Sequence, residues 1–394
     1  MTYRLLAATL WCALLFACGG GGGDDDVLPG DPDARAIVVP DARPPADANP
    51  NFGRLTPRGR YELAVAGDVA ADPARSLVAI SEWYAGAVTL VDVSDPDAPA
   101  QLSRLDGIGY NSDVQIKGDR LYVNYEPVEK GSPLGTGIRI FDISDPTAPV
   151  PTGTVGEGNG HPGLVSCHNT WPQPDRDLLY CASTATGHLI VMSTGETGAG
   201  TPDAPVFIAA LDSPTGECQV PHDMYARGDR LYVAWLCDGF EIYDITAPNI
   251  PVRKAWVTYP DAFTHNLWPT AGDEYLLTTD ETTGGHTRVW DIRDLDAIEE
   301  VAAFAPVPTA IVHNVEISGT IAFVAHYTAG VYALDLTDPR APVAIDGHDF
   351  VGGPDILDGE PFTALRGAWG VEPALPFVYV SDTESGLRIY ELTE

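Results

Sequence analysis

Four short motifs in the sequence place a histidine directly before asparagine or aspartate: CHNTWP at 167–172, PHDMYA at 221–226, THNLWP at 264–269 and VHNVEI at 312–317. Their histidines are His168, His222, His265 and His313. Neutral imidazoles bind first-row transition metals well, so four of them converging on one axis would predict a site for copper, iron or zinc. The neighbouring Asn169, Asp223, Asn266 and Asn314 would then orient the imidazoles as a second shell of hydrogen bonds.

The same motifs also have a structural interpretation. Repeats copy their residues, and a His-Asn pair can satisfy backbone groups at a turn without any ion. Successive side chains of a strand point to opposite faces. If the asparagine and aspartate side chains face the site, the histidines are expected to pack between neighbouring elements instead.

A longer repeat in the sequence predicts the strands that would position these motifs. The phrase GIRIFDISDPTAPVPTGTV at 137–155 recurs at 87–105 and from Phe240, Thr287 and Val331, with a short copy at 387–394 and a weak one at 188–198. The full copies alternate apolar and polar residues up to an aspartate, turn, and resume as a strand. The weak copy has lost the aspartate, and the short copy stops after its first strand. A repeat spaced by roughly 45–55 residues is typical of a propeller or a solenoid.

Before each copy comes a two-strand unit with a tight turn, as in GDRLYVNY at 118–125 and GDRLYVAW at 228–235. Four antiparallel strands per repeat predict an all-β fold, a seven-bladed β-propeller of four-stranded antiparallel blades. The last blade lacks an outer strand. We expect the stretch 60–66 to supply it by pairing beside 387–392, which closes the ring and covers an open edge.

In this arrangement the histidine motifs begin the innermost strand of four successive blades, so their side chains can reach a central channel. The matching positions fall near Asp68, at Ser112 and Asp113, and at Trp369. The loops between the second and third strands open on the same face. They are expected to wall the site with His326, Tyr327, Glu281, His286, Asp382 and Glu384. His161, His188 and His348 are expected in surface loops.

The N-terminal residues predict export. Residues 1–18 carry Arg4, a short apolar run and the lipobox-like sequence Leu-Phe-Ala-Cys that ends at Cys18, which is typical of a lipoprotein signal peptide. The alternative is an ordinary secretory signal with an incidental cysteine. Residues 19–57 are rich in Gly, Asp, Pro and Ala and predict a disordered linker. Residues 58–394 are expected to form the propeller.

The chain is strongly acidic, with a formal net charge of −34. This charge argues against nucleic-acid binding and against adsorption to anionic lipid. It is typical of a soluble surface, and it is also compatible with affinity for Ca²⁺ or a cationic partner.

Four cysteines remain beyond Cys18, namely Cys167, Cys181, Cys218 and Cys237. An even number in an exported protein indicates disulfides. Each pair flanks one hairpin turn, so 167–181 and 218–237 are the expected bonds, with a cross-blade 167–218 bond as the main alternative. Each bond would stabilise the fold by about 3 kcal/mol through loop closure.

The phrases LVDVSDPDAP, RIFDISDPTAP and IYDITAPNIP resemble the LVIVD repeat of bacterial exported proteins over essentially all of 60–394. Together with the lipobox, the chain resembles the choice-of-anchor B group of LVIVD proteins. The resemblance implies a β-propeller attached to the cell surface. The glycine after Cys18, by resemblance to other bacterial lipoproteins, implies the outer membrane, on its periplasmic face or at the cell surface.

Two fainter resemblances concern the histidines. The His-Asn pairs and the fragment Ser81-Glu82-Trp83 are similar to phrases in selenium-binding proteins of the methanethiol oxidase family, whose propellers are thought to hold copper on histidines. Carotenoid oxygenases likewise place four histidines around iron at a propeller axis. These likenesses imply a metal-dependent oxidoreductase.

Three functions therefore follow as hypotheses. The first is a lipid-anchored binding or interaction module of the bacterial cell envelope, with a protein, glycan or small molecule as its ligand. The second is a copper- or iron-dependent oxidoreductase at the histidines. The third is a purely structural surface protein. The sequence contains no P-loop, GxSxG or HExxH motif that would indicate another enzyme class.

Overall fold

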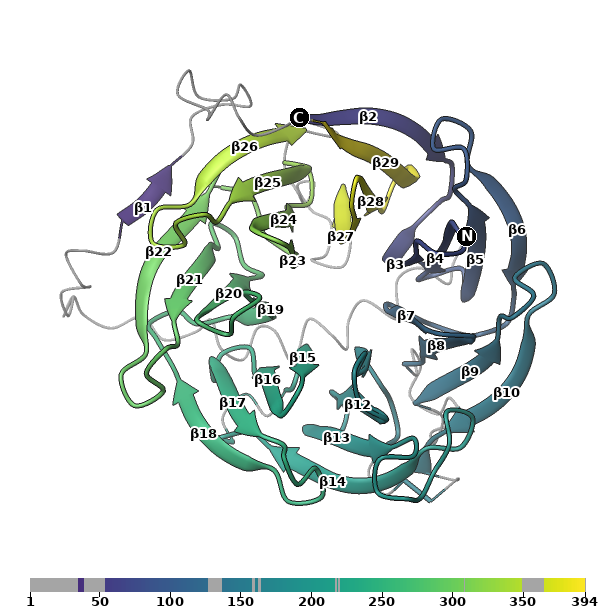
Figure 1. Cartoon of the computed structure of the whole chain (residues 1–394), viewed down its shortest axis with the longest axis horizontal. Helices are drawn as coiled ribbons and strands as arrows, with labels where there is room; N and C mark the ends of the chain where they lie inside the picture. The colour runs from purple at the N-terminus through teal and green to yellow at the C-terminus, as the bar shows by residue number, and fades with distance from the viewer. Residues whose placement is uncertain are drawn as a thin grey trace, which may run out of the picture.

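The computed structural model describes residues 35–38, 54–126, 137–157, 160–161, 164–216, 218, 220–307, 309–348 and 365–393. Within these ranges every regular element is a β-strand, and the strands form seven sheets arranged as the blades of one closed ring (Figure 1). The predicted seven-bladed, all-β propeller is confirmed. None of the described residues forms a helix long and apolar enough to cross a bilayer.

Each blade is a four-stranded antiparallel meander that runs from the channel to the rim. Blade 1 consists of β3 (Ala66–Asp72), β4 (Leu77–Glu82), β5 (Ala87–Asp92) and β6 (Ala100–Leu105). Blade 2 consists of β7 (Val114–Lys117), β8 (Arg120–Asn124), β9 (Ile138–Asp142) and β10 (Val150–Val155). Blade 3 consists of β11 (Thr170–Pro172), β12 (Leu178–Ser183), β13 (His188–Ser193) and β14 (Val206–Asp212). Blade 4 consists of β15 (Met224–Arg227), β16 (Arg230–Ala234), β17 (Phe240–Asp244) and β18 (Val252–Val257).

The remaining blades follow the same order. Blade 5 consists of β19 (Thr264–Pro269), β20 (Tyr275–Asp280), β21 (Thr287–Asp291) and β22 (Glu299–Ala305), and β1 (Arg35–Val38) pairs with β22 in parallel. Blade 6 consists of β23 (Val315–Ser318), β24 (Ile321–Ala325), β25 (Val331–Asp335) and β26 (Val343–His348). Blade 7 consists of β27 (Ala368–Ala374), β28 (Phe377–Asp382), β29 (Gly386–Thr393) and the N-terminal β2 (Arg54–Tyr61).

The aspartate of the repeat forms the turn between the third and fourth strands. The Asp142 carboxylate accepts a hydrogen bond from the backbone N–H of Ser144 at 2.9 Å, and Asp145 accepts one from Thr147 at 3.0 Å. Such carboxylate-to-backbone bonds pre-form a turn two residues on. The repeated Asp-x-Ser/Thr-Asp-Pro phrase is therefore a turn signal, and its period sets the period of the blades.

The ring closes through β2, which lies beside β29 at the outer edge of blade 7 (Figure 1). The predicted pairing partner is confirmed, but the predicted stretch 60–66 is wrong by several residues, because β2 ends at Tyr61 and Ala66 already begins β3. Pro57 and Gly59 are unfavourable inside a strand, so the sequence pattern does not indicate that β2 includes them. A bulge between Pro57 and Arg60 lets the strand pass both residues while pairing continues on either side.

Both predicted disulfide pairs are brought together. The Cα atoms of Cys167 and Cys181 lie 5.7 Å apart, and those of Cys218 and Cys237 lie 5.9 Å apart. These separations are normal for disulfides. The alternative cross-blade bond between Cys167 and Cys218 is excluded by these pairs.

Candidate functional site in the central channel

The four predicted histidines occupy equivalent places at the start of the innermost strands. The backbone N–H of His168 donates to the carbonyl of Ala182, and that of Ala182 donates to the carbonyl of Asn169. The same two-bond pattern holds His222 in blade 4 and His313 in blade 6. His265 lies in the register shift between Thr264 and Asn266 at the start of β19.

The four imidazoles form a continuous arc around the channel. Ring centroids are 4.2 Å apart for His168 and His222, 3.9 Å for His222 and His265, and 4.3 Å for His265 and His313. Trp369 continues the arc in blade 7, with its ring 4.5 Å from that of His313. All four histidines are at most 4% exposed. We call this group the histidine arc.

The histidines and the residues that follow them line the same pocket. This pocket is lined by His168, Asn169, His222, Asp223, His265, Asn266, His313 and Asn314, among others. A regular strand would have sent successive side chains to opposite faces. The register shift at His265 and the irregular first pairs of the other innermost strands allow both sets to face the channel.

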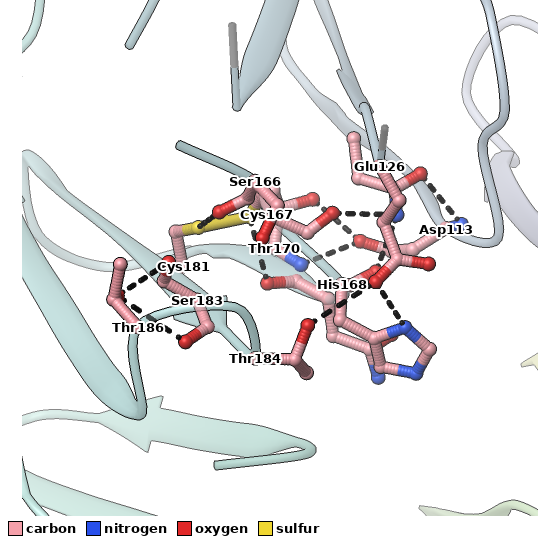
Figure 2. The surroundings of a disulfide bond; sticks show 12 residues. Asp113, Glu126, Ser166, Cys167, His168, Thr170, Cys181, Ser183, Thr184 and Thr186 are labelled. Atoms are coloured by element: carbon pink, nitrogen blue, oxygen red, sulfur yellow. Dashed lines mark hydrogen bonds and ion pairs between the residues drawn. A yellow bond between two sulfur atoms is a disulfide. The ribbon is translucent and has the colours of Figure 1, made fainter. Parts of the chain in front are cut away.

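One histidine of the arc differs electrostatically from the other three. His168 Nδ1 lies 3.1 Å from Glu126 Oε1, and both side chains are buried. Burial by itself lowers the pKa of His168, but the charge and hydrogen bond of Glu126 outweigh it and raise the pKa above its ordinary value. Figure 2 shows this pair beside the Cys167–Cys181 disulfide, which ties the start of blade 3 to its second strand.

The other three imidazoles are held neutral. Burial, followed by the neighbouring imidazoles, lowers the pKa of His222 and of His265 well below its ordinary value. Burial lowers the pKa of His313 to about 3 despite its hydrogen bond to a backbone carbonyl. His313 Nδ1 donates to the carbonyl of Trp369 at 2.6 Å, which leaves its Nε2 as the nitrogen with the lone pair.

Glu281 faces these neutral imidazoles from the loop after β20. Its Oε2 lies 3.4 Å from His265 Nε2, and its Oε1 lies 3.8 Å from His313 Nε2. The hydroxyl of Tyr327 donates to Oε1 at 2.5 Å. Burial raises the pKa of Glu281 to about 7, against the opposing effects of Tyr327 and His168. His222, His265 and Glu281 can offer one ligand atom each with all three atoms within 4.8 Å of one another.

The asparagines and aspartates after the histidines form a second layer with its own hydrogen bonds. Asn266 Nδ2 donates to Asp223 Oδ2 at 2.7 Å, and Asn266 Oδ1 accepts from the backbone N–H of Val315 at 3.0 Å. Burial raises the pKa of Asp223 to about 6. Burial and the adjacent Asp113 raise the pKa of Asp68 well above its ordinary value. This layer is linked to itself and to the backbone rather than to the imidazole nitrogens.

The loop residues expected to wall the site divide into two groups. Glu281 and Tyr327 reach the histidine arc. His326 is fully buried beside the backbone of Ile311, Asp382 pairs with Arg388, and Glu384 pairs with Arg366. His286 is half-buried and is not among the residues that line the pocket.

The expectation for the three remaining histidines is confirmed only in part. His161 lies outside the strands but is only 4% exposed, and His188 has an exposed side chain but begins β13. His348 ends β26, where its Nε2 interacts with the carbonyl of Leu55 at 2.6 Å. Sequence reasoning also missed Glu126, the partner of His168. The sequence did contain a signal for this residue. Glu126 lies two residues after Asn124 at the end of the second strand of blade 2, and Glu281 lies two residues after Thr279 at the matching place in blade 5.

Comparison with known proteins agrees with this architecture. Residues 108–156 match the family model of the LVIVD repeat, and the match covers blade 2. No curated protein matches the chain. Among solved structures, the WD40 repeats of RRP9 are similar in fold, with a TM-score of 0.63, 10% sequence identity, and coverage of 86% of this chain and 100% of that chain. At this identity the likeness concerns the fold alone.

Proposed function

We propose that this LVIVD-repeat propeller is a lipid-anchored binding module of the bacterial cell envelope, and that its principal ligand is a protein. The observation that carries the proposal is the closed seven-bladed ring with an LVIVD repeat and a fold similar to WD40 repeats. Such a ring is a rigid scaffold that presents its loops and outer strands to a partner. The lipobox-like sequence at Cys18 supports the anchor, and the composition of 19–57 supports a tether.

Blade 4 has the surface best suited to a protein contact. Ile250 in the turn before β18 is 66% exposed, and Val252 and Trp256 on β18 are 51% and 40% exposed. Large apolar side chains grouped on an acidic, otherwise polar surface mark interaction sites. An aromatic residue at the centre of such a group is the usual source of binding energy.

The test is photo-crosslinking in cells of the parent organism. A photoreactive residue at position 256 is expected to give a discrete crosslinked protein, and Ile250→Asp in the same chain is expected to abolish that product. The matched control carries the photoreactive residue at Glu299, an exposed position at the rim of blade 5. Crosslinking that is absent at 256, or equal at 256 and 299, would argue against a protein-binding surface on blade 4.

The anchor is tested separately by Cys18→Ala. Because a lipid on this cysteine would be the attachment to the membrane, the variant is expected in the soluble envelope fraction, whereas the unchanged chain sediments with outer membranes. Sedimentation of both forms with the membrane would exclude lipidation of Cys18 as the anchor.

The second candidate is a metal-dependent oxidoreductase, and one observation favours it. Three neutral imidazoles line the channel pocket, and the buried carboxyl group of Glu281 lies 3.4 Å from His265 Nε2, which is the type of donor set that redox metals use. The test is oxygen consumption with small thiols by copper- or iron-loaded protein, with His265→Ala as the comparison. Consumption no faster than by the free ion would eliminate this candidate.

A further inference from the structure

We propose that His222, His265 and Glu281 bind one divalent first-row transition-metal ion, with zinc(II) or iron(II) as the fitting ions. The three side chains come from two adjacent blades and are all buried, and their ligand atoms lie within 4.8 Å of one another. The inference stands independently of the protein-binding role. The oxidoreductase candidate needs such an ion, but the ion does not need that activity.

The distances leave room for an ion. Ligands at about 2.0–2.2 Å from a common metal lie about 3–3.5 Å from each other in a tetrahedral site. His265 Nε2 and Glu281 Oε2 are already 3.4 Å apart. The ligand atom of His222 lies within 4.8 Å of both.

The orientation of the donors is supplied by their neighbours. Oε1 of Glu281 accepts the hydrogen bond of Tyr327, which leaves Oε2 directed at His265. The Nδ1 hydrogen bond of His313 to the backbone of Trp369 shows how one imidazole of the arc is held. The Nδ1 atoms of His222 and His265 are buried and make no hydrogen bond of the usual geometry with any described residue, although the backbone of His265 and His313 lies close enough to influence their charge. A bond at Nδ1 that fixes the ring and exposes Nε2 is the usual support of a metal-bound histidine.

Glu281 also lacks the arginine that several other buried carboxylates have. Glu82 pairs with Arg104, and Glu241 pairs with Arg253. The residue before it, Asp280, pairs with Arg288. Among the ion pairs of the described residues, Glu281 meets only His265 and His313. A buried carboxylate without a positive partner is costly, and a bound cation would supply the missing charge.

The donor set restricts the ion. Two imidazoles and one carboxylate form the ligand sets of catalytic zinc sites and of non-haem iron(II) sites, both of which keep coordination positions open. His222 and His265 line the pocket of the channel, and His313 Nε2 lies 3.8 Å from Glu281 Oε1. His168 does not belong to the set, because among the described residues only His222, His265 and Glu281 have ligand atoms that all lie within 4.8 Å of one another.

The experiment uses the full-length chain, purified in detergent without a histidine tag and stripped with a chelator. It is titrated with Co²⁺ under visible absorption, and Zn²⁺ then displaces the Co²⁺. We expect one equivalent of Co²⁺, and at least about 100-fold weaker binding in Glu281→Gln. The matched control is Glu384→Gln, which removes a loop carboxylate that pairs with Arg366 and does not reach the histidine arc, and it is expected to bind as tightly as the unchanged chain.

Binding of less than a tenth of an equivalent, or equal affinity in the unchanged chain and Glu281→Gln, would overturn the site. If Glu281→Gln does not fold, the test is made on the unchanged chain alone, by thermal unfolding at increasing Zn²⁺ concentrations. An ion that binds the native state raises the melting temperature as its concentration rises. A melting temperature that does not rise would overturn the inference. A bound ion without thiol oxidation would leave this site standing and eliminate the oxidoreductase, and neither result alters the crosslinking at position 256.

Discussion

Neighbouring carboxyl groups in this molecule behave differently because their partners differ. Asp280 and Glu281 are adjacent in the chain, yet the first is held by Arg288 and the second meets imidazoles and a tyrosine hydroxyl. Deeper in the channel, Glu316 and Glu372 face each other, and burial raises the pKa of both. The pKa of a carboxyl group and its ion-pair partner therefore depend on which neighbouring side chains it faces.

The pair of glutamates makes stability depend on pH. Burial raises the pKa of Glu372 from 4.5 to about 8, so the folded state keeps a proton that the unfolded chain releases. Its contribution to stability is complete below about pH 4.5 and is lost as the pH rises toward 8. We expect Glu372→Gln to melt higher than the unchanged chain at pH 8 and to show a weaker decline of melting temperature between pH 5 and 8.

Thermal unfolding followed by circular dichroism across that pH range measures the effect. Glu299→Gln, at an exposed position, is the control and is expected to follow the unchanged chain. Parallel pH profiles for Glu372→Gln and the unchanged chain would show that Glu372 is not the source of the dependence.

At the scale of the element, each blade is a meander stabilised by apolar packing against the next blade. Blade 3 is also stabilised by a disulfide bond. Cys167 and Cys181 lie in a buried cluster with Tyr122, Ile140 and Leu179. The bond joins the residue before His168 to the second strand of the same blade. It therefore fixes the start of the innermost strand, where the histidine arc begins.

Removal of this bond is expected to destabilise the protein measurably. The double variant Cys167→Ala/Cys181→Ala should lose about 3 kcal/mol of unfolding free energy, because the two cysteines close a loop of 14 residues' separation. Urea denaturation with and without a reducing agent measures it. The unchanged chain should lose stability on reduction. A midpoint that is insensitive both to the substitution and to the reductant would contradict the prediction.

At the scale of the whole molecule, the ring is held shut by a strand from the other end of the chain. Leu55 of β2 is 1% exposed and packs between blades 6 and 7. Its backbone N–H donates to Asp346 at 3.1 Å and its carbonyl lies 2.6 Å from His348 Nε2. Closure thus joins blade 7 to blade 6 as well as completing blade 7.

Leu55→Ala should accordingly weaken the entire ring. Truncation of a buried leucine costs about 2–5 kcal/mol of unfolding free energy, and here the cavity opens at the point of closure. Thr56→Ala, whose side chain is exposed on the same strand, is the control and should stay within about 0.5 kcal/mol. Chemical denaturation of both variants measures the difference. Equal midpoints would indicate that β2 is dispensable for closure.

The sequence by itself determined the architecture, because the information is local and repeated. The Asp-Pro turns, the alternating strands and the tight hairpins recur with one period, and a chain of such units can bury its faces only by stacking them in a ring. The equivalent places of His168, His222, His265 and His313 followed from the same period. The disulfides followed too, since each pair flanks one hairpin.

Only the tertiary structure decided which of these residues act together. The separation of His168 from the other three histidines depends on Glu126 and Glu281, which come from loops of blades 2 and 5. The sequence predicted that an N-terminal strand pairs with β29, but which residues form β2, and the bulge between Pro57 and Arg60, were decided only by the tertiary structure. The repeat period in the sequence specifies the strands and turns that all blades share. The contacts across the channel depend instead on the residues that differ from blade to blade. Only folding brings those residues together.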